Sequence, residues 1–214
     1  VPADYDALSA VLDVPLERLS RAWSAVNHLN AVANTPELRE AYNANLARVT
    51  EFHTRLGADE RLYAKYKAVA ASGAHLNPAR RQALAHAIRD FVLSGAELQG
   101  DARTRFAAIQ ERGAELGQQF SEHVLDATDG YTLTVPTERL AGVPADVLQQ
   151  TADAAKAAGE TGHKLSLHMP VYLPVMQYAT DRALREQLYQ AYSTRASELG
   201  PAERDNGPLM TELL

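Results

Sequence analysis

The chain has 214 residues, of which 46% are hydrophobic and 22% charged, and its formal net charge is −6. This composition is typical of a globular protein rather than a disordered or fibrous one. The absence of cysteine excludes disulfides and thiolate metal sites, and the acidic balance argues against a nucleic-acid surface. No apolar run reaches the ~20 residues that cross a bilayer, and the N-terminus lacks a signal-peptide pattern. We therefore expect a cytoplasmic protein that binds neither nucleic acid nor membrane.

Helical periodicity dominates the first part of the chain. Thr35 and Asn77 each stand before a proline, which predicts an N-cap followed by the first helical residue. The last helix of this part has about 27 residues and would span about 40 Å at 1.5 Å per residue, which predicts an elongated fold. The predicted helices span approximately residues 16–33, 36–57, 62–72, 78–95 and 101–127.

The hydrophobic period changes after residue 130. Apolar residues alternate with polar ones at 131–135 and again at 164–169, which predicts two half-buried strands whose pairing direction stays open. Further helices are expected at about 144–158, 171–178 and 181–196, and from Gly207 onward. The predicted fold class over residues 1–214 is mainly α: an elongated multi-helix body with a small two-stranded β insert.

The two ends of the sequence favour a piece of a longer protein. The first residue is Val1 rather than Met. The last residues, Thr211 to Leu214, continue an apolar helical pattern with no Gly, Asn or basic residue after it to cap the helix. We therefore expect a fragment of a larger chain.

No zinc-binding motif is present in the sequence. A helical zinc site of the H-E-x-x-H type needs two imidazoles a helical turn apart with a glutamate beside them. None of the seven histidines is followed by Glu, and no two are three or four residues apart. His123 and Asp126 share a helix face, and we expect an exposed pair there rather than metal ligands. The histidines are His28, His53, His75, His86, His123, His163 and His168.

Other partial motifs are better explained by structure than by chemistry. The glycines of residues 159–164 follow a helix and precede a strand, the reverse of a phosphate loop, so we expect a turn. Ser72 and Ser94 precede glycines without a strand-to-helix elbow, so we expect helix ends. Carboxylates such as Glu122 and Asp126 are common in acidic helical proteins. The sequence therefore predicts no catalytic, cofactor-binding or metal-binding residue in this chain.

A stretch rich in side-chain amides begins at Trp23. Asn27, His28 and Asn30 either line a groove or bridge helices through hydrogen bonds to backbone groups, as buried amides generally require. We favour the bridging role.

Five blocks of sequence carry a resemblance to a known family. In chain order they are WSAVNHLNAVANTPEL (23–38), RDFVLSG (89–95), VLDAT (124–128), LAGVP (140–144) and YSTRASELGP (192–201). Together they resemble the thimet oligopeptidase family of zinc metallopeptidases, and the likeness extends over nearly the whole chain from about Trp23. The first twenty residues are less distinctive.

The resemblance implies a large, mostly helical parent enzyme whose two lobes flank a deep channel that admits short peptides. In that family an H-E-x-x-H helix and a further glutamate hold one zinc ion in the C-terminal half. The resemblance therefore implies that zinc is bound by the intact parent and not by this chain, and that no catalytic or metal residue carries over. The partners that it implies are short peptides and the C-terminal catalytic half of the same chain.

Two functions thus remain open. The chain is either an N-terminal channel-wall and scaffold part of a zinc oligopeptidase, inactive alone, or a self-contained non-enzymatic helical module that binds peptides or proteins. An H-E-x-x-H motif downstream of Leu214 would favour the first.

Overall fold

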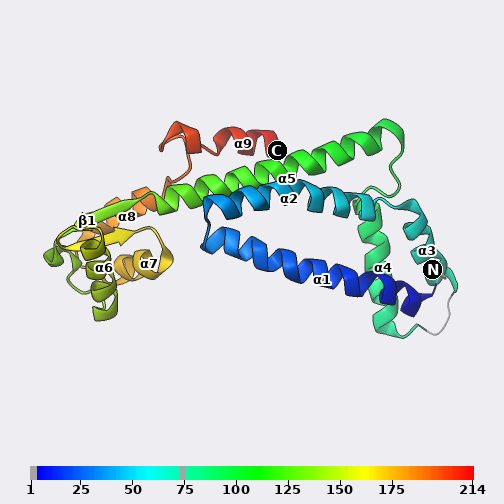
Figure 1. Cartoon of the computed structure of the whole chain (residues 1–214), viewed down its shortest axis with the longest axis horizontal. Coiled ribbons are helices and arrows are strands. Elements are labelled where there is room, and N and C mark those ends of the chain that lie inside the picture. The colour runs from blue at the N-terminus through cyan, green and yellow to red at the C-terminus, as the bar shows by residue number, and fades with distance from the viewer. Residues whose placement is uncertain (1–3, 73–75) are drawn as a thin grey trace. The chain divides into compact units, whose positions relative to one another are not determined.

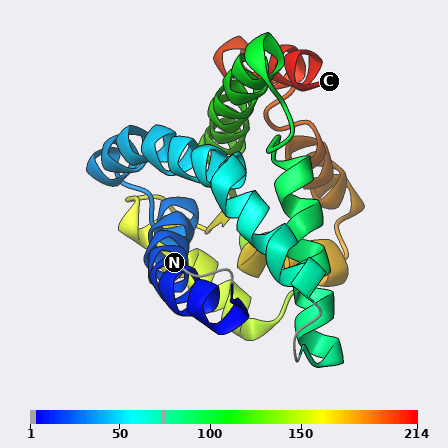
Figure 2. The same ribbon diagram turned by 90° about the vertical axis from the view of Figure 1, so that its right-hand side faces the viewer.

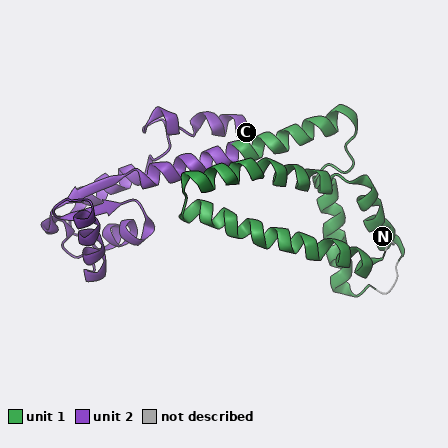
Figure 3. Ribbon diagram, viewed as in Figure 1, with its two compact units in different colours: residues 1–115 green, residues 116–214 purple. Residues whose placement is uncertain are grey.

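The computed structural model describes residues 4–72 and 76–214 (Figure 1). Within these residues it has nine α-helices and one two-stranded antiparallel sheet, which confirms the mainly α class with a small β insert. His75, one of the seven histidines, and Gly73, the glycine that follows Ser72, lie outside the described residues. The chain divides into two compact units, Val1–Glu115 and Leu116–Leu214, where the sequence predicted one body (Figure 3). The boundary falls inside a continuous helix, so no linker composition marks it.

Three helices of the first unit have side-chain caps at their starts. The Asp4 carboxylate accepts a hydrogen bond from the Ala7 N–H at 2.9 Å. Thr35 and Asn77 cap the following helices as predicted, since their side-chain oxygens accept from the N–H groups three residues on, at 3.2 and 2.8 Å. The helices of the first unit are α1 (Tyr5–Val32), α2 (Pro36–Gly57), α3 (Glu60–Ser72), α4 (Pro78–Leu93) and the first half of α5 (Gly100–Asp129).

Helix α1 begins at Tyr5, well before the predicted stripe, and it contains Pro15. A proline inside a helix removes one backbone hydrogen bond, which weakens any prediction from local sequence. The start of α1 is stabilised by tertiary contacts instead, because Leu8 is buried in a small core with Val69 and Leu84.

The helices of the first unit pack as neighbouring pairs. α1 and α2 contact one another and run antiparallel (Figure 1), and α3 contacts α4 on the side that faces the viewer in Figure 2. None of the helices in the described part of the chain is both long enough and apolar enough to cross a bilayer.

The second unit is built around the small sheet. Strand β1 (Thr132–Val135) pairs antiparallel with β2 (His163–Ser166), with Leu133 opposite Leu165. The side chains of Leu165, Val175, Leu184 and Leu188 have no exposed surface, so this core is well packed. The helices of this unit are α6 (Ala145–Ala157), α7 (Met169–Tyr178), α8 (Arg182–Ser193) and α9 (Gly207–Leu213), with 3-10 turns η1 (Thr137–Leu140) and η2 (Ala202–Arg204).

Two predicted boundaries in this unit are wrong. The second strand ends at Ser166 rather than at residue 169, because Met169 already begins α7, whose first turn holds a proline. α8 ends at Ser193 rather than Ala196. Ala196 has a φ of +52°, and its carbonyl accepts a hydrogen bond from the Asn206 N–H at 3.1 Å. That contact closes a turn that helical periodicity does not reveal.

Candidate functional site

The amide-rich stretch of α1 connects α1 to α2 through side chains. The Tyr42 hydroxyl donates a hydrogen bond to Asn27 Oδ1 at 2.8 Å, and the Tyr42 ring stacks on Trp23 with centroids 4.8 Å apart. Asn27 therefore bridges the two helices, as predicted, but its partner is a buried tyrosine and not a backbone group. This bond fixes the orientation of Tyr42 and, through the stack, of Trp23.

Asn30 orders the turn between the same helices. Its side chain is buried and its Oδ1 accepts a hydrogen bond from Asn34 Nδ2 at 2.7 Å, while Asn34 Oδ1 accepts from Arg39 Nε at 2.9 Å. His28 is exposed. The structure therefore does not bring Asn27, His28 and Asn30 together as the walls of one groove.

A different hollow in the first unit has the character of a ligand pocket, and we refer to it as the uncharged pocket. It has a volume of about 340 Å³, at the lower end of the roughly 300–1,000 Å³ typical of ligand sites. None of its lining residues is Asp, Glu, Lys or Arg. They come from α1, α2, the end of α4 and α5: Trp23, Leu46, Val49, Thr50, His53, Thr54, Leu93, Ser94, Phe106 and Gln110.

Two glycines let the walls of the uncharged pocket approach one another. A Cβ at Gly57, the last residue of α2, would lie 2.6 Å from the Ser94 Cβ, so only glycine lets the ends of α2 and α4 come this close. Gly95 has a φ of +85°, and a Cβ there would lie 3.1 Å from the Phe106 ring. The chain turns at this residue so that α5 can place Phe106 against the end of α4.

The hydroxyls and the side-chain amide of the uncharged pocket have no hydrogen-bond partners within the described residues. The hydroxyls of Thr50, Thr54 and Ser94 and the amide of Gln110 make no hydrogen bond there, although both threonines and Ser94 are half-buried. Partly buried polar groups are normally satisfied by protein, water or ligand. The pocket therefore offers apolar contact together with free donors and acceptors.

The uncharged pocket was not predicted from the sequence, although part of its wall has a periodic pattern there. Leu46, Thr50 and Thr54 recur every four residues, which places two hydroxyls on the same face of α2 as an apolar stripe. The residues that α4 and α5 add to the pocket come together only through tertiary packing, so no comparable periodic pattern marks them in the sequence. Ser94 is the C-cap of α4, the helix-end position predicted for it.

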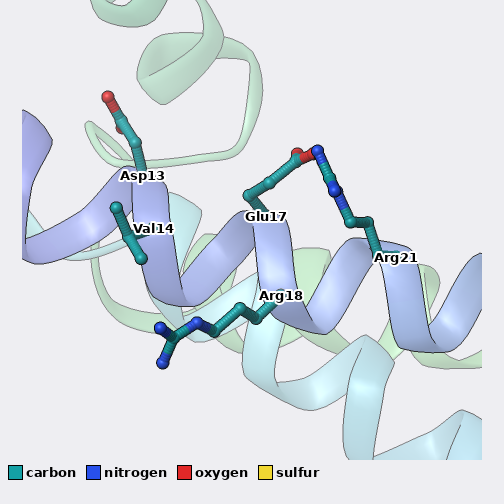
Figure 4. A pocket seen from close by; sticks show the side chains of 5 residues that line it. All are labelled: Asp13, Val14, Glu17, Arg18 and Arg21. Atoms are coloured by element: carbon teal, nitrogen blue, oxygen red, sulfur yellow. The ribbon is translucent and has the colours of Figure 1, made fainter.

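A second hollow lies on the surface of α1 alone. Its lining residues all come from one helix, and Figure 4 shows Asp13 and Arg18 pointing away from each other. Glu17 and Arg21 point toward one another and form an exposed ion pair at 2.7 Å. Exposed pairs of this kind contribute little, and the side chains do not converge on a common point.

A smaller cavity of about 210 Å³ is lined by residues of α1, α3 and α4. The Ser9 hydroxyl donates to Asp13 at its edge. Burial raises the pKa of the Tyr66 phenol, and the nearby Asp13 charge raises it further, so Tyr66 stays protonated at neutral pH. Among the residues that line this cavity, Asp13 is the one acid, and none is a histidine, cysteine or lysine.

The described histidines make structural contacts in several places. His163 is buried beside β1, where its Nδ1 lies 3.0 Å from Thr151 Oγ1 and its Nε2 lies 3.1 Å from Thr137 Oγ1. His168 pairs with Asp129 at 3.0 Å. The contacts of His163 connect α6, η1 and β2, which is the role of a satisfied core histidine.

The prediction of an exposed pair at His123 and Asp126 is wrong. Both residues are half-buried, and His123 Nδ1 lies 2.8 Å from Asn206 Oδ1. The Asp126 carbonyl accepts a hydrogen bond from Arg204 at 3.1 Å. The segment that contains η2 packs along α5, a long-range contact that helical periodicity cannot show.

The predicted turn at residues 159–164 has the geometry of a turn. Gly159 and Gly162 have φ values of +73° and +99°, and a Cβ at Gly162 would lie 2.5 Å from the Val135 carbonyl oxygen. The Glu160 carboxylate accepts from Thr134 and pairs with Lys164 at 3.4 Å, and the Thr134 hydroxyl lowers its pKa. Across residues 4–72 and 76–214, no three His, Asp or Glu side chains come together as metal ligands.

Comparison with known proteins identifies the class of N-terminal domain to which this helical chain is similar. Residues 1–103 match the family model described as Neurolysin/Thimet oligopeptidase, N-terminal domain. The chain is 44% identical over 203 residues to oligopeptidase A of Haemophilus influenzae, which covers 92% of this chain and 30% of that protein. The resemblance to the thimet oligopeptidase family is therefore confirmed, for the N-terminal part of those proteins.

Further relatives agree with this assignment. Oligopeptidase A of Salmonella typhimurium is 42% identical over 219 residues, which cover 100% of this chain and 32% of that protein. A probable cytosolic oligopeptidase A of Arabidopsis thaliana is 37% identical over 224 residues, with the same two shares. The chain thus spans about a third of the length of the relatives it matches.

Proposed function

We propose that this chain is the N-terminal channel-wall and scaffold part of a zinc-dependent oligopeptidase, a metalloendopeptidase that hydrolyses short peptides, and that it is inactive alone. The supporting observation is the 42–45% identity to bacterial oligopeptidase A proteins over at least 92% of the chain. The names of these relatives describe peptidases that act on oligopeptides. The same names give less support to the alternative, a self-contained non-enzymatic helical module.

The residues of this chain indicate which part of the parent protein would bind zinc. A catalytic zinc site needs three protein ligands and an open position, and the described residues bring no such group together. They do not fit a zinc ion, so we assign zinc to the C-terminal catalytic half of the parent. There it would activate water as a Lewis acid. We propose short peptides and that catalytic half as the partners of this chain, and the cytoplasm as its location.

Residues of this chain would act by limiting which peptides enter. Exposed small residues on α1 and α2 allow a direct test in the full-length protein, because bulky side chains there should narrow a channel without disturbing the core. Ala25→Trp and Ala31→Trp in α1, and Ala44→Trp and Ala47→Trp in α2, alter exposed positions.

The measurement is the hydrolysis rate of a series of peptides of increasing length by each full-length variant. We expect at least one variant to shift the length limit while the rate on the shortest peptide stays unchanged. An identical length profile in all four variants, each shown to be folded by circular dichroism, would contradict the channel-wall role.

A further inference from the structure

We infer that the uncharged pocket binds one apolar residue of a short peptide together with its main-chain amide, an inference that rests on the proposed function. Five apolar side chains line the pocket beside five polar ones, so both parts of such a residue find a complementary surface. A volume of about 340 Å³ suits a group of this size better than a folded partner.

The charges around the pocket select against ionised ligands. No Asp, Glu, Lys or Arg lines it, and the side chain of His53, its one imidazole, is exposed, so a bound charge would lose water without gaining a buried ionic partner. Glu51 and Arg55, which follow the lining residues Thr50 and Thr54 in α2, pair with each other at 3.5 Å and are largely exposed. The occupant is therefore a neutral residue and not an aspartate, glutamate, lysine or arginine.

The hydroxyls supply the recognition of the peptide backbone. Thr50 and Thr54 lie on one face of α2, and Ser94 lies opposite, where Gly57 lets the helix ends meet. None of the three hydroxyls has a partner in the described residues. A peptide N–H and C=O entering the pocket would satisfy them, and each such bond is worth roughly 0.5–1.5 kcal/mol, or about 2- to 13-fold in affinity.

Trp23 reports directly on occupancy. It is the single tryptophan of the chain, it lines the pocket, and its stack on Tyr42 holds it in one position. Titration of the chain with acetyl-Ala-Phe-Ala-amide should therefore produce a saturable change in tryptophan fluorescence. The same titration with acetyl-Ala-Glu-Ala-amide, whose central residue is charged, should produce none.

Two variants of adjacent residues test the location. Leu93 lines the pocket and is 69% exposed, whereas its neighbour Val92 is 40% exposed and does not line it. Leu93→Glu should abolish the saturable change with the phenylalanine peptide, and Val92→Glu should leave it intact. Thr50→Val and Thr54→Val, which keep the side-chain shape, should each weaken binding by about 2- to 13-fold.

The inference is overturned by no saturable response to the neutral peptide, by equal responses to both peptides, or by equal effects of the two glutamate variants. These outcomes test the pocket alone and do not decide whether the proposed function is correct. A full-length protein that cleaves peptides while its Trp23 pocket stays empty would keep the first proposal and remove the second. Binding by the pocket in a full-length protein without peptidase activity would do the reverse.

Discussion

The two glycines inside α5 have no structural reason to be glycine within the described residues. Gly113 and Gly117 lie four residues apart in a continuous helix, and a Cβ added at either position meets no atom within 4 Å. Glycine inside a helix is about 0.8–1.0 kcal/mol less favourable than alanine, largely because its unfolded chain has more freedom. Gly113→Ala and Gly117→Ala should therefore each raise the free energy of unfolding by roughly 0.5–1 kcal/mol, and the double variant by about 1–2 kcal/mol.

A third glycine provides a control of opposite sign. Gly142 has a φ of +93°, and a Cβ there would lie 2.3 Å from the Tyr178 carbonyl oxygen. Gly142→Ala should therefore lower the free energy of unfolding by more than about 1 kcal/mol. Urea unfolding followed by far-UV circular dichroism measures the free energy of unfolding for all three substitutions. In thermal unfolding, each kcal/mol corresponds to a shift of roughly 2–4 °C in Tm for a chain of this size. If the α5 substitutions destabilise the chain as Gly142→Ala does, helix propensity is the wrong explanation.

Substitutions at three further positions test the core, an ion pair and a cap. Leu184 is fully buried, so Leu184→Ala should lower the free energy of unfolding by about 2–5 kcal/mol in urea titrations, and a loss below 1 kcal/mol would contradict the packing described. Arg139 Nε donates to Asp181 at 2.7 Å and holds the pKa of that carboxyl below its ordinary value of 3.8. The pair therefore stabilises the fold above that pH and ceases to do so as the pH falls through the lowered pKa, so Arg139→Met should lose less stability than the unchanged chain when the pH is lowered below 3.8. Thr35→Ala should cost about 1 kcal/mol and Thr35→Gly only a few tenths by the same assay, whereas equal losses would argue against a capping role.

Local signals in the sequence were sufficient for most of the fold. Thr35 and Asn77 mark helix starts because a side-chain oxygen before a proline satisfies a free backbone N–H, and both caps are present. The alternation at 131–135 predicts β1, which spans Thr132–Val135. These features depend on neighbours within a few residues, which the sequence displays directly.

Features that depend on distant contacts could not be predicted. Helix α1 extends back to Tyr5 because Leu8 packs on residues of α3 and α4, despite Pro15. His123 is half-buried because Asn206, far along the chain, contacts it. The uncharged pocket likewise needs Gly57 and Gly95 to bring separate helices together, and sequence spacing shows only its α2 wall.

We propose that the chemistry of peptide hydrolysis lies outside this chain. The most direct measurement adds one equivalent of zinc to the purified chain and to a full-length protein that contains it, and follows the cleavage of short peptides with and without a chelator. The account predicts chelator-sensitive hydrolysis by the full-length protein and none by the chain alone. Chelator-sensitive turnover by the chain alone would contradict it.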